Sequence, residues 1–320
     1  MPGMRRTVRF LTSGIAFLAA AVAGNSGGTK TLLELEKPGI DRITRLTERE
    51  HATILFTIEN EIVGYAKEGR VEWIGPTTEP EPGDCKWPHP ALSHDGLRVA
   101  FVTYGATPKH CRIVIRDMPR SVQRDLIETS GDPGEISWSW DDSEICFSED
   151  GIFSVSVRDN ARKRLLPKGL WLWGTMQWLH NGNDLVIEKE VAIPQKEPGH
   201  VRYQGNLLLV HGGEARFIDV GKSPAVSPLS DRIAYFSSGK IVAINADQTE
   251  KVILAKAPLG PLLMREELIG SIAWSPDGNR LFFGTIVSDN YNDKRYLVDV
   301  QSGRRETFLS HTSIEIKGWR

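Results

Sequence analysis

The chain has 320 residues, 40% of them hydrophobic, and its formal net charge is −2. This length suits one large domain or two ordinary ones, and the apolar content is sufficient for a packed core. Nucleic-acid-binding domains are usually visibly basic, so the near-neutral charge excludes that class and predicts no nucleic-acid partner.

The first 23 residues have the features of a secretory signal peptide. Arg5, Arg6 and Arg9 form a basic start, an apolar run follows, and Ala21-Val22-Ala23 supplies the small residues of a cleavage site. The uncharged stretch at residues 10–24 has 15 residues, whereas about 20 are needed to span a bilayer. We therefore predict that residues 1–23 are removed and that the mature chain is periplasmic or secreted, with no stable membrane span. An uncleaved anchor is the alternative.

Residues 24–50 are expected to form a polar N-terminal segment that is compatible with a helix over 29–50. After this segment the chain contains three cysteines, Cys85, Cys111 and Cys146. Cys146 lies inside an apolar run and is predicted to be in the core. Cys85 and Cys111 either pair, which an exported protein permits, or remain thiols. Neither CxxC, HExxH nor zinc-finger spacing occurs, so the sequence predicts no metal and no cofactor.

A strand–turn–strand unit recurs along the rest of the chain. Its clearest copy is Trp274-Ser275-Pro276-Asp277-Gly278, in which the turn residues separate two apolar runs. In register with Trp274, the other copies begin at Leu92, Trp138, Trp178 and Val226, with spacings of 46, 40, 48 and 48 residues. A period of about 40–50 residues built from strands is typical of four-stranded propeller blades.

The two ends of this region complete each other. Residues 314–319 read as a first strand with no hairpin after it, and Trp319 lies 45 residues after Trp274. Residues 53–74 read as a blade without its first strand. The fold class is therefore predicted to be all-β. Residues 51–320 are expected to form a six-bladed β-propeller whose closing blade is split between N- and C-terminal strands.

The Trp274-Ser275-Pro276-Asp277-Gly278 string resembles the WD-like repeat of the TolB-type six-bladed β-propeller family. The same repeat occurs in the propeller domains of prolyl-oligopeptidase-like enzymes, but the G-x-S-x-G nucleophile elbow of a hydrolase domain is absent from this sequence. The TolB resemblance implies a periplasmic protein that docks partners at the cell envelope.

The register also predicts a polar ring at one end of the propeller channel. Five of the six positions that lie three residues before the anchors are polar, and the sixth is Ile316; the five are His89, Glu135, Thr175, Ser223 and Ser271. We expect these residues to lie at the channel mouth and to bind a ligand or partner group. A hydrated funnel without a ligand is the alternative.

Long connections are expected at the same end of the blades. The connection at 189–205 is the longest and contains His200, Arg202 and Tyr203 as candidate partner-binding residues. Further connections are expected at 104–110, 255–270 and 288–294.

The function predicted from these patterns is non-catalytic binding of an envelope protein partner through loops around the channel mouth, with no catalytic residue assigned. The alternative is a metal-dependent polysaccharide lyase or glycan hydrolase on the same face, for which a glycan would be the partner. A convergence of three or four His, Asp or Glu side chains would distinguish the second function from the first.

Overall fold

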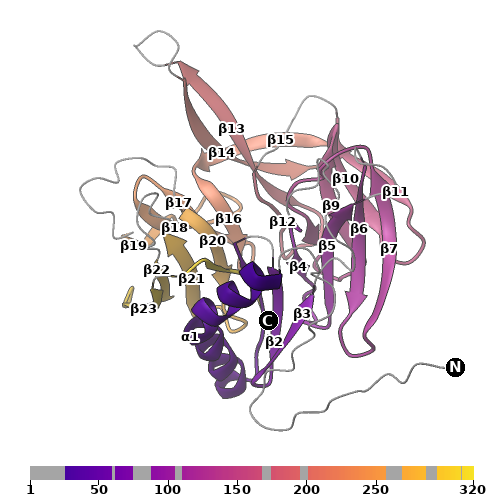
Figure 1. Cartoon of the computed structure of the whole chain (residues 1–320). Coiled ribbons are helices and arrows are strands. Elements are labelled where there is room, and N and C mark those ends of the chain that lie inside the picture. Colours follow the sequence, from indigo (N-terminus) through magenta and orange to yellow (C-terminus); the bar gives the residue numbers. More distant parts are fainter. Residues whose placement is uncertain are drawn as a thin grey trace, which may run out of the picture.

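The computed structural model describes residues 26–59, 62–74, 88–104, 110–167, 174–194, 201–256, 269–285, 294–310 and 312–320. The predicted signal peptide lies outside these residues. The strands form six four-stranded antiparallel sheets, which are arranged as a β-propeller (Figure 1). The predicted fold class is confirmed. No helix among the described residues is long and apolar enough to cross a membrane.

In each blade the first strand lies at the channel and the fourth at the rim, and the blades follow one another in chain order. The strands of the first three blades are β4 (Ala91–Leu92), β5 (Arg98–Tyr104), β6 (Cys111–Asp117), β7 (Val122–Thr129); β8 (Ser137–Trp138), β9 (Glu144–Glu149), β10 (Gly151–Ser156), β11 (Arg162–Leu166); and β12 (Met176–Trp178), β13 (Leu185–Pro194), β14 (Val201–His211), β15 (Glu214–Val220).

The next two blades contain β16 (Lys222–Val226), β17 (Arg232–Ser237), β18 (Lys240–Asn245), β19 (Val252–Lys256); and β20 (Ile269–Trp274), β21 (Arg280–Thr285), β22 (Lys294–Asp299), β23 (Arg305–Ser310). The closing blade has the order β24 (Ile314–Trp319), β1 (Thr53–Ile58), β2 (Ile62–Lys67), β3 (Arg70–Ile74).

The closing blade joins the two ends of the chain, as the sequence predicted. Strand β24 pairs antiparallel with β1, from Ile54 opposite Trp319 to Ile58 opposite Ile314. The pairing extends by one residue, because the N–H of Arg320 donates to the carbonyl of Thr53 at 2.8 Å and the N–H of Thr53 donates back. The facing edges of β24 and β1 are thereby paired, so neither is left exposed.

The anchor residues hold neighbouring blades together. The indole N–H of Trp138 donates to the carbonyl of Ala91 in the preceding blade at 3.1 Å, and Trp274 donates to Ala225 at 2.9 Å. Both tryptophans are almost completely buried. At these two anchors the tryptophan therefore contributes apolar burial and also satisfies a buried carbonyl of the adjacent innermost strand.

The N-terminal segment is a helix, α1 (Ser26–Glu50), that packs on the outside of the propeller (Figure 1). Ile40, Ile43 and Leu46 form one apolar face at helical spacing, and they join a core cluster with residues of the closing blade and of β20–β23. The buried carboxylate of Glu36 accepts hydrogen bonds from Thr312 and Ser313, just before β24. The helix thus covers the junction between the closing blade and its neighbour.

The cysteines fall into two classes. Cys146 is a buried free thiol in the core, as expected, and burial raises the pKa of that thiol to about 12. Cys111 is disulfide-bonded, and its partner lies outside the described residues. Of the two alternatives that the sequence left open for Cys111, the structure therefore has the disulfide.

Candidate functional site

A cavity of about 290 Å³ runs along the propeller axis, and residues from the innermost strands of all six blades line it. It has two ends, which we name from the chain direction. The strand-start mouth lies where the innermost strands begin, and the turn mouth lies where they enter their first hairpin turns. Residues at both ends line the same cavity.

Four of the five predicted ring residues line this cavity at the strand-start mouth: Glu135, Thr175, Ser223 and Ser271. His89 is not among the lining residues, but its ring lies behind Glu135. In the closing blade, Ile316 is buried in the core, whereas Glu315 and Lys317 line the cavity. The register of β24 against β1 shifts by one residue between Leu55 and Phe56, and this bulge places the two charged neighbours of Ile316 on the channel side.

The charges at the strand-start mouth are paired across three blades. The Nζ of Lys317 lies 3.0 Å from Glu315 and 3.8 Å from Glu135. The His89 ring lies between two further carboxylates, with Nδ1 3.6 Å from Glu135 and Nε2 3.4 Å from Asp132. These are ion-pair distances, and the buried Nε2 makes no well-aligned hydrogen bond.

This pairing shifts the titration of the groups involved. Burial favours the neutral form of His89, but Asp132 and Glu135 outweigh it and raise the pKa of the imidazole to about 9. Burial also opposes ionisation of Glu135, yet Lys317 and His89 lower the pKa of that carboxyl to about 2. The mouth therefore holds fixed charges of both signs at neutral pH.

The hydroxyl side chains of the ring differ in how much hydrogen-bonding capacity they retain. The Ser271 Oγ donates to the carbonyl of Ile316 at 2.6 Å. Within the described part of the chain, the hydroxyls of Thr175 and Ser223 make no such bond. The Ser223 main chain is fixed instead, because its N–H donates to the buried carboxylate of Glu188 at 2.8 Å and its φ is 52°. Two hydroxyls therefore face the cavity with free capacity.

The connection at 189–205 is mostly strand, and its description as a loop was wrong. Strands β13 and β14 stay paired from Leu185 opposite Val210 out to Pro194 opposite Val201, so they form a long hairpin that projects from the propeller (Figure 1). Tyr203 lies on this hairpin with 53% of its surface exposed. Arg202 pairs with Ile193 through its main chain. His200 lies outside the described residues, as do most of the other predicted connections.

The turn mouth carries an aromatic stack that the sequence reasoning missed. The rings of His94 and Trp140 lie 4.4 Å apart between centroids, and those of Trp140 and His180 lie 4.1 Å apart. Each residue lies two positions after its anchor, where two later turns have Pro228 and Pro276. The alignment of the repeats could therefore have predicted the stack, because three successive blades have an aromatic ring at the same position of the repeat.

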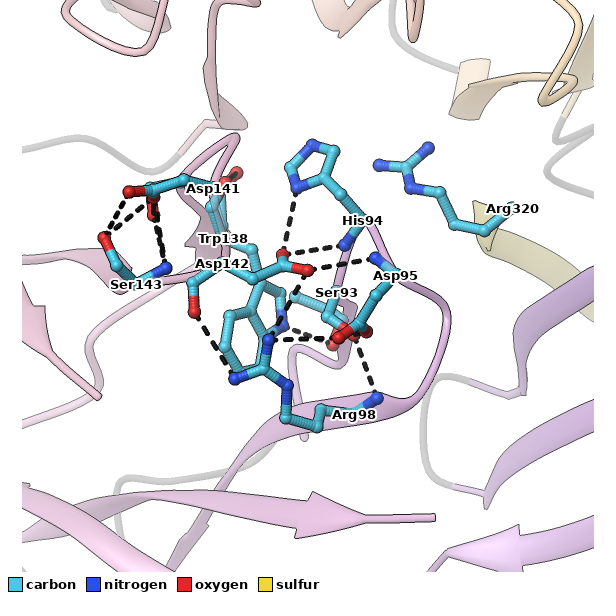
Figure 2. A network of polar contacts seen from close by, with 12 residues as sticks. Ser93, His94, Asp95, Arg98, Trp138, Asp141, Asp142, Ser143 and Arg320 are labelled. Atoms are coloured by element: carbon cyan, nitrogen blue, oxygen red, sulfur yellow. Dashed lines mark hydrogen bonds and ion pairs between the residues drawn. The ribbon is translucent and has the colours of Figure 1, made fainter. Parts of the chain in front are cut away.

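Asp142 joins two neighbouring turns at this mouth (Figure 2). It occupies the left-handed position that Gly96, Gly182 and Gly278 occupy in other turns, with a φ of 57°. Its carboxylate accepts hydrogen bonds from the main-chain N–H groups of His94 at 2.8 Å and Asp95 at 2.9 Å, and it lies 3.2 Å from Nδ1 of His94. The carboxylate therefore caps the turn of the preceding blade.

Arg320 also lines the cavity at the turn mouth, beside the network of Asp142 in Figure 2. Its position follows from ring closure, since its main chain pairs with Thr53 of β1. Among the described residues, no group of three or more His, Cys, Asp or Glu side chains has an arrangement that could hold a metal ion.

Comparisons with known proteins place the chain by its fold. No family model and no curated protein matches it. The crystal structure of TolB from Acinetobacter baumannii is similar, with a TM-score of 0.59 and 15% identity, over 84% of this chain and 66% of that one. A chain of the nidogen/laminin complex gives 0.57 and 13%, over 84% and 97%. This chain spans about two thirds of the TolB chain. At these identities the likeness shows the fold alone, which is the six-bladed propeller of TolB that the sequence resemblance predicted.

Proposed function

We propose that this protein is an exported, non-catalytic β-propeller that binds an extended segment of an envelope protein partner at the strand-start mouth. One observation carries the proposal. Glu135, Thr175, Ser223 and Ser271 come from four different blades and converge on one end of a single cavity. Such a ring offers donors and acceptors from several directions to a chain that enters along the axis.

The chemistry of the mouth suits a peptide better than a highly charged ligand. Its charges neutralise one another, as Lys317 lies between Glu135 and Glu315. The free hydroxyls of Thr175 and Ser223 suit the amide and carbonyl groups of a main chain. The projecting β13–β14 hairpin adds an exposed aromatic side chain, Tyr203, of the kind enriched in protein interfaces. The nidogen/laminin structure shows a protein of this fold within a protein complex.

Affinity capture from envelope extract with the tagged mature chain tests the proposal when paired variants are compared. Thr175→Tyr narrows the mouth, and Thr249→Tyr adds the same ring to an exposed turn whose residues do not line the cavity. We expect Thr175→Tyr to abolish capture of a partner that both the wild type and Thr249→Tyr retain. Equal capture by all three would refute the proposal. Stoichiometric manganese, calcium or zinc in the purified protein would favour the lyase alternative instead.

Export is tested separately. We expect the mature chain to lack residues 1–23 and to occur in the periplasmic or secreted fraction, as mass spectrometry of fractionated cells would show.

A further inference from the structure

The turn mouth holds a cation that no described residue neutralises. The Nη1 of Arg320 donates to the carbonyl of its own neighbour Trp319 at 3.1 Å. Its Nε is buried and has no hydrogen-bond partner among the described residues, and no described carboxylate forms an ion pair with the guanidinium. A buried charged donor without an acceptor is costly, so such a group commonly marks a place where a ligand supplies the acceptor.

Among the described residues, Asp142 is the acid that interacts electrostatically with Arg320, and its carboxylate already has other hydrogen-bond partners. Asp142 attracts the guanidinium, but its two oxygens accept from the main chain of His94 and Asp95, and it also pairs with Arg98 at 3.5 Å. Burial lowers the pKa of Arg320 to about 10, so the side chain is still charged at neutral pH. Lys317, the other cation of the cavity, differs because it lies between two carboxylates.

The wall beside Arg320 is aromatic. His94 and Trp140 both line the cavity, and His180 supports Trp140 from behind through the stack. Burial and the neighbouring Arg320 lower the pKa of His94, although Asp142 opposes them, so its imidazole is neutral at neutral pH. This wall therefore offers uncharged aromatic side chains next to the guanidinium of Arg320.

We propose that the turn mouth binds a small carboxylate that carries a planar ring, with Arg320 binding the carboxylate and Trp140 and His94 contacting the ring. An arginine guanidinium matches a carboxylate with two parallel hydrogen bonds, and aromatic faces add ring contacts. The cavity of about 290 Å³ limits the ligand to a small molecule. Because the site is at the opposite end from the polar ring, this proposal does not depend on the proposed function.

Calorimetric titration of the full chain with benzoate, acetate and benzyl alcohol separates the two parts of the recognition. Benzoate has the charge and the ring, acetate has the charge alone, and benzyl alcohol has the ring alone. We expect benzoate to bind most tightly. Arg320→Gln should weaken benzoate binding about tenfold or more without changing that of benzyl alcohol. Arg320→Lys should recover part of the loss, and Trp140→Leu should weaken benzoate but not acetate.

Arg216→Gln is the matched control, since this exposed arginine lies away from the cavity and should leave benzoate affinity unchanged. Circular dichroism of each variant establishes that the propeller is folded. The proposal is overturned if benzoate does not bind the wild type at about 50 mM, which is roughly fiftyfold above a Kd of 1 mM. It is equally overturned if benzoate and benzyl alcohol bind alike, or if Arg320→Gln leaves benzoate binding intact.

Discussion

Replacing Asp142 by asparagine should destabilise the propeller by about 2–4 kcal/mol. The carboxylate accepts two main-chain N–H groups of the preceding turn, at 2.8 and 2.9 Å, and its side chain is only 8% exposed. Hydrogen bonds to a buried charge contribute about 1.5–3 kcal/mol each. Asparagine retains one acceptor oxygen, but its amide group would face the second N–H and leave it unpaired. Asparagine also tolerates the φ of 57°, so backbone strain does not contribute to the difference.

Urea unfolding followed by tryptophan fluorescence measures this effect, and Asp141→Asn is the control. Asp141 is the adjacent residue, and it accepts hydrogen bonds only within its own turn, from Ser139 and Ser143. We expect the control to cost less than about 1 kcal/mol, because the amide oxygen can replace the carboxylate there. Similar unfolding midpoints for both variants would show that bonding between blades at the turn mouth adds nothing to stability.

The pH dependence provides a second check on the same residue. Burial raises the pKa of Asp142, but the hydrogen bonds from His94 and Asp95 outweigh burial, and the folded pKa is lowered. The contribution of the carboxylate is therefore complete above the unfolded pKa of about 3.9 and is lost as the pH falls through the folded value. The stability difference between wild type and Asp142→Asn should be constant near neutrality and shrink below about pH 4. A difference that stays constant down to pH 2 (roughly two units below the unfolded pKa) would contradict this reasoning.

Three further predictions follow from other contacts. Trp138→Phe should cost about 1–2 kcal/mol more than Trp319→Phe in urea unfolding, because both rings stack under an arginine but only the Trp138 N–H has an acceptor. His89→Gln should be less stable than wild type at pH 6, and the gap should close as the pH rises from about 6.5 through 9, since the folded pKa is raised to about 9. Glu36→Gln should cost about 1–3 kcal/mol and speed hydrogen exchange in α1, because its buried carboxylate accepts three hydrogen bonds; unchanged exchange would mean that the helix is held by its apolar face alone.

The architecture could be predicted because its signals are local and repeated. Trp138 and Trp274 recur with similar turn residues after them, and each copy strengthens the assignment of the others. The closing blade could be predicted from the same repeat spacing, because Trp319 lies 45 residues after Trp274. Four of the five polar ring residues could be placed at the cavity for the same reason, because they share one position relative to the anchor.

What the sequence did not reveal depends on register and on contacts between blades. A bulge in β24 places Glu315 and Lys317 on the channel, and a bulge arises from pairing with β1, which lies more than 250 residues away in the chain. The long β13–β14 hairpin was missed because Pro194, Pro198 and Gly199 interrupt the sequence there and favour a loop. The stack of Trp140 with two histidines was visible only as an unusual residue type at a turn position.

The two mouths differ in how their charges are satisfied, and this difference supports two separate roles. At the strand-start mouth Lys317 lies between Glu315 and Glu135, and His89 lies between Glu135 and Asp132. The charges there are paired, and the free hydrogen-bonding capacity lies in neutral hydroxyls. At the turn mouth the carboxylate of Asp142 accepts from main-chain N–H groups, and the buried Nε of Arg320 has no hydrogen-bond partner in the part of the chain that the structure describes. A structure that needed only stability would gain from pairing these two groups with each other. Instead, the main-chain pairing of Arg320 with Thr53, which helps to close the propeller, also places Arg320 at the cavity.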